Sequence, residues 1–219
     1  MEQRSIVEQS ERDLGGAASI LVRQRRDHAD LQTIMLGYGD AKNGDERARA
    51  VDHLTDRALR HAFAEETVLF PAVRRLVPHR ADELTGHIEG EHQEINQLLQ
   101  RLRAMRPDDP GYDESARRAI ALVRDDARNE EDRLLPALQA AAGTPVLLAI
   151  GIAWEVMRRA APNLPHPRIP RRPWGNVAAG VPLAVTDRVE RLGRVAAGAA
   201  GVAATLVAGA SGRFGRRRT

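Results

Sequence analysis

Apolar side chains recur three or four positions apart along much of the chain, the spacing that keeps one face of an α-helix together. Four such stretches run from about residue 16 to 37, 45 to 77, 80 to 105 and 112 to 142. Gly37, Gly39, Pro78 and the run from Pro107 to Gly111 separate them, and no stretch alternates with a period of two for long enough to form a sheet. The pattern predicts an all-α fold, an antiparallel up-down four-helix bundle built from two related helical hairpins.

The sequence after the bundle changes character twice. A more apolar stretch predicts an additional helix packed on the bundle, and its uncharged part, residues 143 to 153, is too short to span a bilayer. Five prolines between 162 and 173 predict a stiff linker. The expected organisation is a polar N-terminal segment at 1–15, the bundle at 16–142, the additional helix at 143–161, a Pro/Arg-rich linker at 162–179, and an Ala/Gly-rich basic tail, weakly helical or disordered, at 180–219.

Charge divides the chain into an acidic body and a basic tail. From Arg158 onward the chain has 12 arginines and two acidic residues, Asp187 and Glu190, a net charge of +10. The total net charge of +3 therefore leaves −7 for residues 1 to 157. Such a tail suits contact with an anionic membrane surface through residues 194–219, although a solvated tail is the simpler interpretation. Without a recognition helix or an aromatic platform, the sequence does not favour nucleic-acid binding.

Composition excludes several kinds of chemistry. The chain has no cysteine, which excludes disulfides, thiolate metal sites and cysteine nucleophiles. No glycine-rich nucleophile turn or phosphate-binding loop stands out, so a classical enzyme such as a hydrolase is not expected. The first 14 residues are polar, without the apolar core of a secretory signal, so we expect a cytoplasmic protein, with any membrane contact peripheral and made by the tail.

A duplicated motif carries the candidate chemistry. The stretch from His61 to Val73 recurs 65 positions later, with Asp126 in place of His61 and Glu130 in place of Glu65. Helix positions four apart share a face, so His61 and Glu65 point the same way, as do Asp126 and Glu130. The other two helices match at an offset of 64 and each carries one histidine on its apolar face. The six side chains expected to point inward are His28, His61, Glu65, His92, Asp126 and Glu130.

An apolar core does not tolerate such a cluster unless its members are paired with one another or bind metal. Inward His and carboxylate ligands on four helices are how helical bundles hold two irons or two manganese ions. Nitrogen and oxygen donors without sulfur suit iron, manganese or zinc. A lone histidine on a helix is more often a surface residue than a ligand, and three on apolar faces weaken that simpler interpretation.

The remaining polar residues near these motifs receive lesser roles. His53 and His87 lie off the apolar faces and are expected in an outer shell or at the surface, and His79 and His166 receive no role. Glu66 and Glu131 are interpreted as solvated carboxylates or as groups that orient the ligands. Pro71 lies inside the second predicted helix, where it predicts a kink one turn beyond Glu65.

Together these motifs resemble the hemerythrin-like HHE cation-binding domain family, particularly its actinobacterial type. The resemblance covers about residues 20 to 142 and rests on the pairs Asp27-His28 and Glu91-His92 and on the two motifs that continue into Leu69-Phe70-Pro71 and Leu134-Leu135-Pro136. It implies a non-haem di-iron centre, with manganese or zinc less favoured, and O₂, NO or peroxide as small ligands. It also implies redox or iron sensing or peroxide handling. The ligands that it implies are His28, His61, Glu65, His92 and Glu130.

Asp126 departs from the family pattern, which has His at this position. Two outcomes are open. If Asp126 binds iron, its negative charge favours the oxidised metal, lowers the reduction potential and shifts the chemistry toward oxidase-like or peroxide-consuming behaviour. If it does not, a water completes the shell or the second metal is lost. The alternative function is then a scaffold or interaction protein with a degenerate site, docked on a membrane or a partner through the basic tail.

Overall fold

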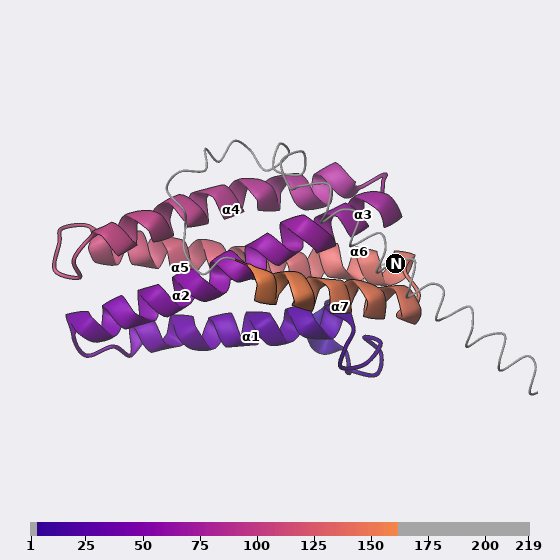
Figure 1. The fold of residues 1–219 in the computed structure, drawn as a ribbon, viewed down its shortest axis with the longest axis horizontal. Helices are drawn as coiled ribbons and strands as arrows, with labels where there is room; N and C mark the ends of the chain where they lie inside the picture. The colour runs from indigo at the N-terminus through magenta and orange to yellow at the C-terminus, as the bar shows by residue number, and fades with distance from the viewer. Residues whose placement is uncertain (1–3, 162–219) are drawn as a thin grey trace, which may run out of the picture. The chain divides into compact units, whose positions relative to one another are not determined.

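The structure of the chain is a computed structural model that describes residues 4–161 (Figure 1). These residues form a helical bundle with no strand among them, which confirms the predicted fold class. The predictions for the linker at 162–179, the tail at 180–219, His166 and the membrane contact of 194–219 lie outside the described residues.

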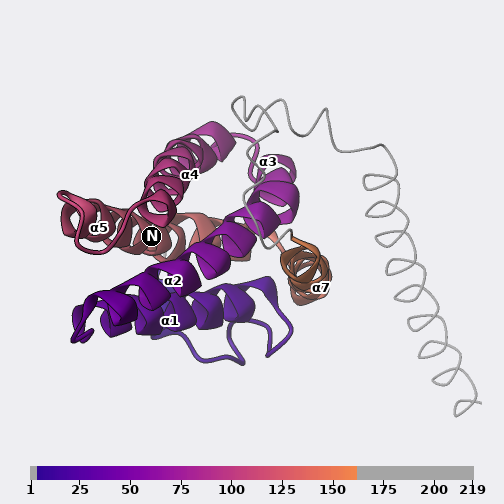
Figure 2. The ribbon, with the colours of Figure 1, turned by 60° about the vertical axis from the view of Figure 1, so that its left-hand side comes forward.

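Four long helices form the bundle and a fifth lies against it. They are α1 (Ile20–Gly39), α2 (Gly44–Ala64), α4 (Ala81–Ala104), α5 (Tyr112–Asn129) and α7 (Thr144–Ala160). Helix α1 pairs with α2 and α4 pairs with α5, and the two hairpins meet where α2 contacts α4 and α1 contacts α5 (Figures 1 and 2). The short helices α3 (Phe70–Leu76) and α6 (Leu135–Ala141) continue α2 and α5.

Side-chain caps and breakers set the ends of these helices. The Ser19 hydroxyl accepts a hydrogen bond from the Leu21 amide at the start of α1. The Asn43 side chain accepts one from the Glu46 amide at the start of α2, and the Glu46 carboxylate accepts one from the Lys42 amide in return. These contacts satisfy amides that have no partner within the helix. At α1 and α2, the local sequence therefore marks where the helix starts.

A wide helical turn interrupts each half of the duplication at the same place. The π-helical turns η2 (Glu65–Leu69) and η3 (Glu130–Leu134) each begin at a candidate ligand glutamate. Each ends one residue before the dipeptide that contains Pro71 or Pro136, which lack the amide that an α-helix requires there. The predicted kink is therefore a π-helical turn that starts at Glu65 itself, a distortion common at functional sites.

The buried interior consists of two apolar clusters with a polar layer between them. One cluster gathers around Phe70, Leu135 and Trp154, and the other around Leu54, Leu99 and other residues of the long helices. Along each long helix of the bundle, the residues of one cluster give way to those of the other at the inward-facing polar positions. The candidate site therefore occupies the middle of the bundle.

The segment before α1 belongs to this core, although the sequence predicted only a polar stretch. Ile6, in the short 3₁₀ helix η1 (Ile6–Glu8), and Leu14 are fully buried. The Ser5 hydroxyl donates to the Glu131 carbonyl, and an Arg25 guanidinium nitrogen donates to the Gln9 carbonyl. Two apolar residues in a charged segment thus suffice to anchor it on the bundle.

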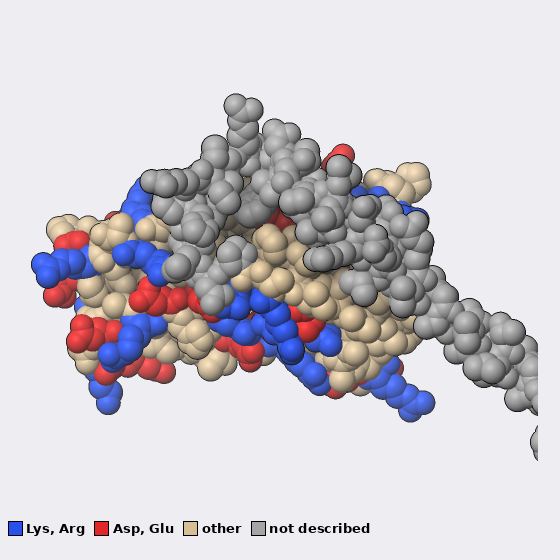
Figure 3. Space-filling model, in the orientation of Figure 1, with Lys and Arg blue, Asp and Glu red and all other residues tan. Residues whose placement is uncertain are grey.

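The visible part of the face in Figure 3 carries charges of both signs. Basic and acidic side chains alternate over the face shown in Figure 3, with no broad area of one sign. Within residues 4–161, no helix combines the length and the apolar content needed to cross a membrane.

Candidate metal centre

The structure buries all six side chains that the sequence predicted to point inward. His28, His61, His92 and Asp126 are each at most 5% exposed, and Glu65 and Glu130 are 0% exposed. They come from α1, α2, α4, α5 and the first residues of the two π-helical turns. One polar layer therefore collects donors from all four long helices of the bundle.

Four of these side chains form a compact group. One ligand atom from each of His28, His61, Glu65 and Glu130 lies within 4.8 Å of the others. Nε2 of His61 is 2.7 Å from Oε1 of Glu65 and 3.3 Å from Nε2 of His28. Donor atoms bound to one ion at about 2.0–2.2 Å lie about 3 Å apart. The two distances from Nε2 of His61 are therefore compatible with donors to one ion, and the group is a candidate metal site.

His92 and Asp126 extend the cluster on the side of the second hairpin. Nε2 of His92 is 3.4 Å from Oδ2 of Asp126 and 3.5 Å from Oε2 of Glu65. Glu65 thus directs one carboxylate oxygen toward His61 and the other toward His92. This is the position of a carboxylate able to bridge two ions.

A carboxylate outside the cluster fixes each of the three histidines. The Nδ1 of His28 contacts Glu131 at 2.9 Å, and the Nδ1 of His92 contacts Glu66 at 2.8 Å. The Nδ1 of His61 contacts Asp27 at 2.8 Å. Because a carboxylate accepts the Nδ1 proton, each neutral imidazole turns the lone pair of Nε2 toward the centre, as metal-binding histidines do.

The sequence predicted orienting roles for Glu66 and Glu131. It did not predict the other side chains that surround the centre. Gln24 is fully buried and donates to Oε1 of Glu65 at 2.8 Å. Arg57 donates to Oδ1 of Asp27 at 2.7 Å, and the Trp154 ring lies edge-on to the His61 ring. Of these residues, Asp27 alone could have been identified from the sequence, because an acidic residue precedes both His28 and His92.

The cluster perturbs the pKa values of its members in opposite directions. Burial and the charge of Glu65 raise the pKa of Glu130 to about 8. Burial alone would raise the pKa of Glu65 as well, but the positive charge of His61 and its hydrogen bond outweigh burial and lower it to about 2. Burial alone would lower the pKa of His28, but the nearby carboxylates of Glu130 and Glu131 raise it to about 9. Without metal, the cluster therefore holds extra protons.

Several donor atoms of the cluster have no hydrogen-bond partner within the described part of the chain. They are Oε2 of Glu65, Oδ1 of Asp126, Nε2 of His92 and both carboxylate oxygens of Glu130. Buried polar atoms without partners are rare in folded proteins, and a bound ion is one of the ordinary explanations. The donor set of imidazole nitrogens and carboxylate oxygens fits iron, manganese or zinc.

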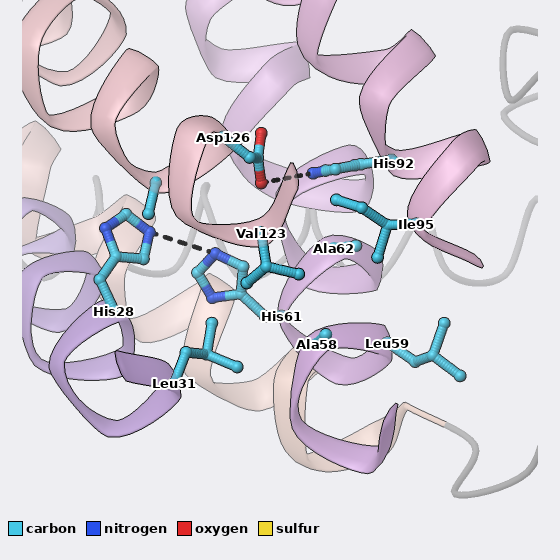
Figure 4. Close-up of a pocket in the computed structure, with 11 residues that line it drawn as sticks. His28, Leu31, Ala58, Leu59, His61, Ala62, His92, Ile95, Val123 and Asp126 are labelled. Atoms are coloured by element: carbon cyan, nitrogen blue, oxygen red, sulfur yellow. Dashed lines mark hydrogen bonds and ion pairs between the residues drawn. The ribbon is translucent and has the colours of Figure 1, made fainter. Parts of the chain in front are cut away.

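A small cavity of about 20 Å³ lies beside the cluster. Figure 4 shows His28, His61, His92 and Asp126 at this cavity, with Leu31 and Val123 among its apolar lining. Its volume is about that needed to hold one water molecule. The cavity therefore offers room for a ligand of very few atoms next to the metal-binding atoms.

The structure separates the other described histidines from the cluster. His53, His79 and His87 are exposed, and Nε2 of His87 contacts Glu91 at 3.3 Å. This agrees with the surface positions predicted for His53 and His87.

Fold and site together define a helical bundle with a buried cluster of His and carboxylate side chains able to bind a cation. The family model of the hemerythrin HHE cation binding domain matches residues 19–138, more than half of the chain. The chain therefore belongs to the hemerythrin HHE family, as the resemblance implied.

Two curated proteins are similar to parts of the chain. The chain is 21% identical over 164 residues to an uncharacterized hemerythrin-like protein of Schizosaccharomyces pombe, covering 75% of this chain and 81% of that protein. It is 33% identical over 79 residues to a DNA nickase of a Nostoc species, covering 36% of this chain and only 22% of that protein. No solved structure matches the chain.

Proposed function

We propose that this chain holds a non-haem di-iron centre and uses it to bind O₂, NO or peroxide in redox or iron sensing or in peroxide handling. Its ligands are His28, His61, Glu65, His92, Asp126 and Glu130. The observation that carries the proposal is the position of Glu65, whose Oε1 lies 2.7 Å from Nε2 of His61 and whose Oε2 lies 3.5 Å from Nε2 of His92. One carboxylate thus serves two groups of donors.

The two groups differ in their donors. His28, His61, Glu65 and Glu130 supply two nitrogens and two oxygens within 4.8 Å. On the other side, His92 is the one imidazole and Asp126 replaces the second. The first ion is therefore expected to bind more tightly than the second, because its ligands are already gathered and include two imidazoles.

The surroundings suit the binding of a small ligand more than the turnover of a large substrate. The cavity beside the cluster holds about 20 Å³ and has apolar walls that include Leu31, Ile95 and Val123. Phe70 stacks on the ring of His92, with the ring centres 5.7 Å apart. These side chains make the surroundings of the cluster largely apolar and leave space for a ligand of very few atoms.

The presence of Asp126 favours redox sensing or peroxide handling over simple reversible oxygen binding. With Glu65 and Glu130 it brings a third carboxylate charge to the centre, where the family pattern has a neutral imidazole. Additional negative charge stabilises the more oxidised metal, so the reduction potential is expected to be low.

The test is metal analysis and spectroscopy of the full chain expressed with iron. We expect about two irons per chain, as in other carboxylate-bridged bundles, and a charge-transfer absorption that changes with O₂, NO or peroxide. A well-folded chain that takes up no iron, manganese or zinc contradicts the proposal and favours the scaffold alternative. Uptake of zinc alone contradicts the redox role.

A further inference from the structure

Helix α7 lies beyond residues 19–138, the part matched by the family, yet one of its side chains contacts His61 and another contacts Asp27, which pairs with His61. The Trp154 ring meets the His61 ring edge-on, with the ring centres 5.8 Å apart. Arg158 lies one helical turn later, on the same face of α7. Its Nη1 is 3.5 Å from Oδ1 of Asp27, and Asp27 holds the Nδ1 of His61.

The packing of α7 fixes this contact. A Cβ atom at Gly151 would lie 2.2 Å from the Ala18 carbonyl oxygen and 2.7 Å from the Ile20 amide nitrogen. The backbone of α7 therefore approaches the start of α1 more closely than a side chain would allow. Trp154, one turn later, is 1% exposed, so this part of α7 packs into the hydrophobic core.

Two guanidinium groups flank the carboxylate that orients His61. Arg57 contacts Oδ1 of Asp27 at 2.7 Å, and Arg158 approaches the same oxygen. Arg158 also lies over the Trp154 ring, 5.5 Å from its centre. The positive charges hold Asp27 in place and weaken its pull on the Nδ1 proton of His61. A weaker pull leaves the imidazole a poorer electron donor and so disfavours the oxidised state of a bound metal.

We propose that α7 is a positioning element of the metal centre. Trp154 fixes the plane of the His61 ring, and Arg158, acting through Asp27, raises the reduction potential of the metal that His61 holds. This inference rests on the proposed metal centre and adds to it two residues outside the family domain. It makes the helix after the bundle part of the site.

The first experiment measures the midpoint potential of the iron-loaded full chain and its variants. Arg158→Gln removes the charge and is expected to shift the potential to a more negative value, whereas Arg158→Lys keeps the charge and stays close to native. Arg159→Gln is the matched control, because Arg159 pairs with Glu155 and is 77% exposed in its side chain. Equal potentials for Arg158→Gln and Arg159→Gln overturn the role of Arg158.

The second experiment measures how fast iron is lost to an excess of chelator. Loss of a group that supports a ligand costs about 10–100-fold in metal affinity, so we expect release about tenfold faster from Trp154→Leu and near-native release from Trp154→Phe. Leu147→Ala is the control, since Leu147 is buried on α7 two turns earlier and its loss weakens packing away from His61. Release from Trp154→Leu no faster than from Leu147→Ala overturns the role of Trp154.

The controls also separate this inference from the proposed function. A native chain that binds no iron contradicts the metal centre itself. A native chain that binds iron, with α7 variants indistinguishable from their controls, contradicts only the role of α7.

Discussion

Asp126 lies with Oδ2 3.4 Å from Nε2 of His92, in the place that the His61 imidazole takes beside His28 in the first hairpin. The two hairpins also correspond at the residues next to these side chains. Asp27 accepts the Nδ1 proton of His61. The residue that corresponds to Asp27 is Glu91, whose Oε2 is buried and has no hydrogen-bond partner among residues 4–161. Burial and the charge of Asp126 raise the pKa of Glu91. The second hairpin therefore keeps the carboxylate that would orient an imidazole at position 126.

Asp126→His is expected to strengthen the second metal position. The new imidazole replaces an anionic donor, and Glu91 is placed to accept its Nδ1 proton. We expect more iron retained per chain after gel filtration and a midpoint potential more positive than native, because one negative charge is removed. Asp125→His, at the exposed neighbouring position, is the control. Iron content and potential that stay native in Asp126→His would show that position 126 does not face the metal.

Glu66→Ala is expected to weaken metal binding without removing a ligand. Glu66 accepts the Nδ1 proton of His92 at 2.8 Å, and loss of such a partner typically costs about 10–100-fold in metal affinity. The measurement is iron affinity by competition with a chelator. Asp132→Ala, at an exposed position of η3, should bind iron as native does, and equal affinity in the two variants would count against the orienting role of Glu66.

The metal-free protein is expected to lose stability as pH rises above neutral. The pKa of Glu130 is raised to about 8 and that of His28 to about 9. A group whose folded pKa exceeds its unfolded value stabilises the fold fully below the unfolded pKa, and this contribution is lost as pH rises through the folded pKa. The melting temperature of the metal-free chain should therefore be lower at about pH 9.5 than at about pH 7.

Bound metal should reduce this loss, because ligands bind in their deprotonated forms and the ion replaces their protons. Glu130→Gln cannot titrate and should show a smaller fall in the metal-free state. A metal-free melting temperature that stays constant or rises between these pH values would contradict the assigned proton positions.

Two glycines on different helices should respond in opposite ways to the same substitution. Gly151→Ala places a methyl group against the Ala18 carbonyl oxygen and should destabilise the fold by about 1–3 kcal/mol, the usual cost of overpacking. Gly90→Ala in α4 meets no atom within 4 Å and should stabilise it by up to about 1 kcal/mol through helix propensity. Urea denaturation measures both. A Gly151→Ala variant as stable as native would mean that α7 is not packed as closely as described.

The helices were predictable because breakers and caps act locally. Proline and glycine between the apolar stretches placed the ends of α4, of α7 and of the continuous stretch from the start of α5 to the end of α6 within one residue or so of the observed ones. The sequence did not predict that the helix would widen into π-helical turns at these positions. Pro71 signalled a disturbance, but whether the backbone kinks or widens depends on how the next turn packs against the core.

The inward residues were predictable because helical periodicity decides which side faces the core. Their orienting partners were less so, since the contact between His61 and Asp27 depends on how α1 and α2 lie side by side. Trp154 and Arg158 reach the site only because Gly151 lets α7 approach α1. No spacing within the motifs encodes that contact. The apolar anchors Ile6 and Leu14 were likewise hidden in a segment whose average is polar.

The most direct test of the account is the metal content of the full chain after reconstitution with iron, measured by elemental analysis beside His61→Ala. We expect native protein to retain iron through gel filtration and His61→Ala to lose most of it while remaining helical. Iron retained equally by His61→Ala, or a folded native chain without bound metal, would contradict the assignment of this buried cluster as a metal centre.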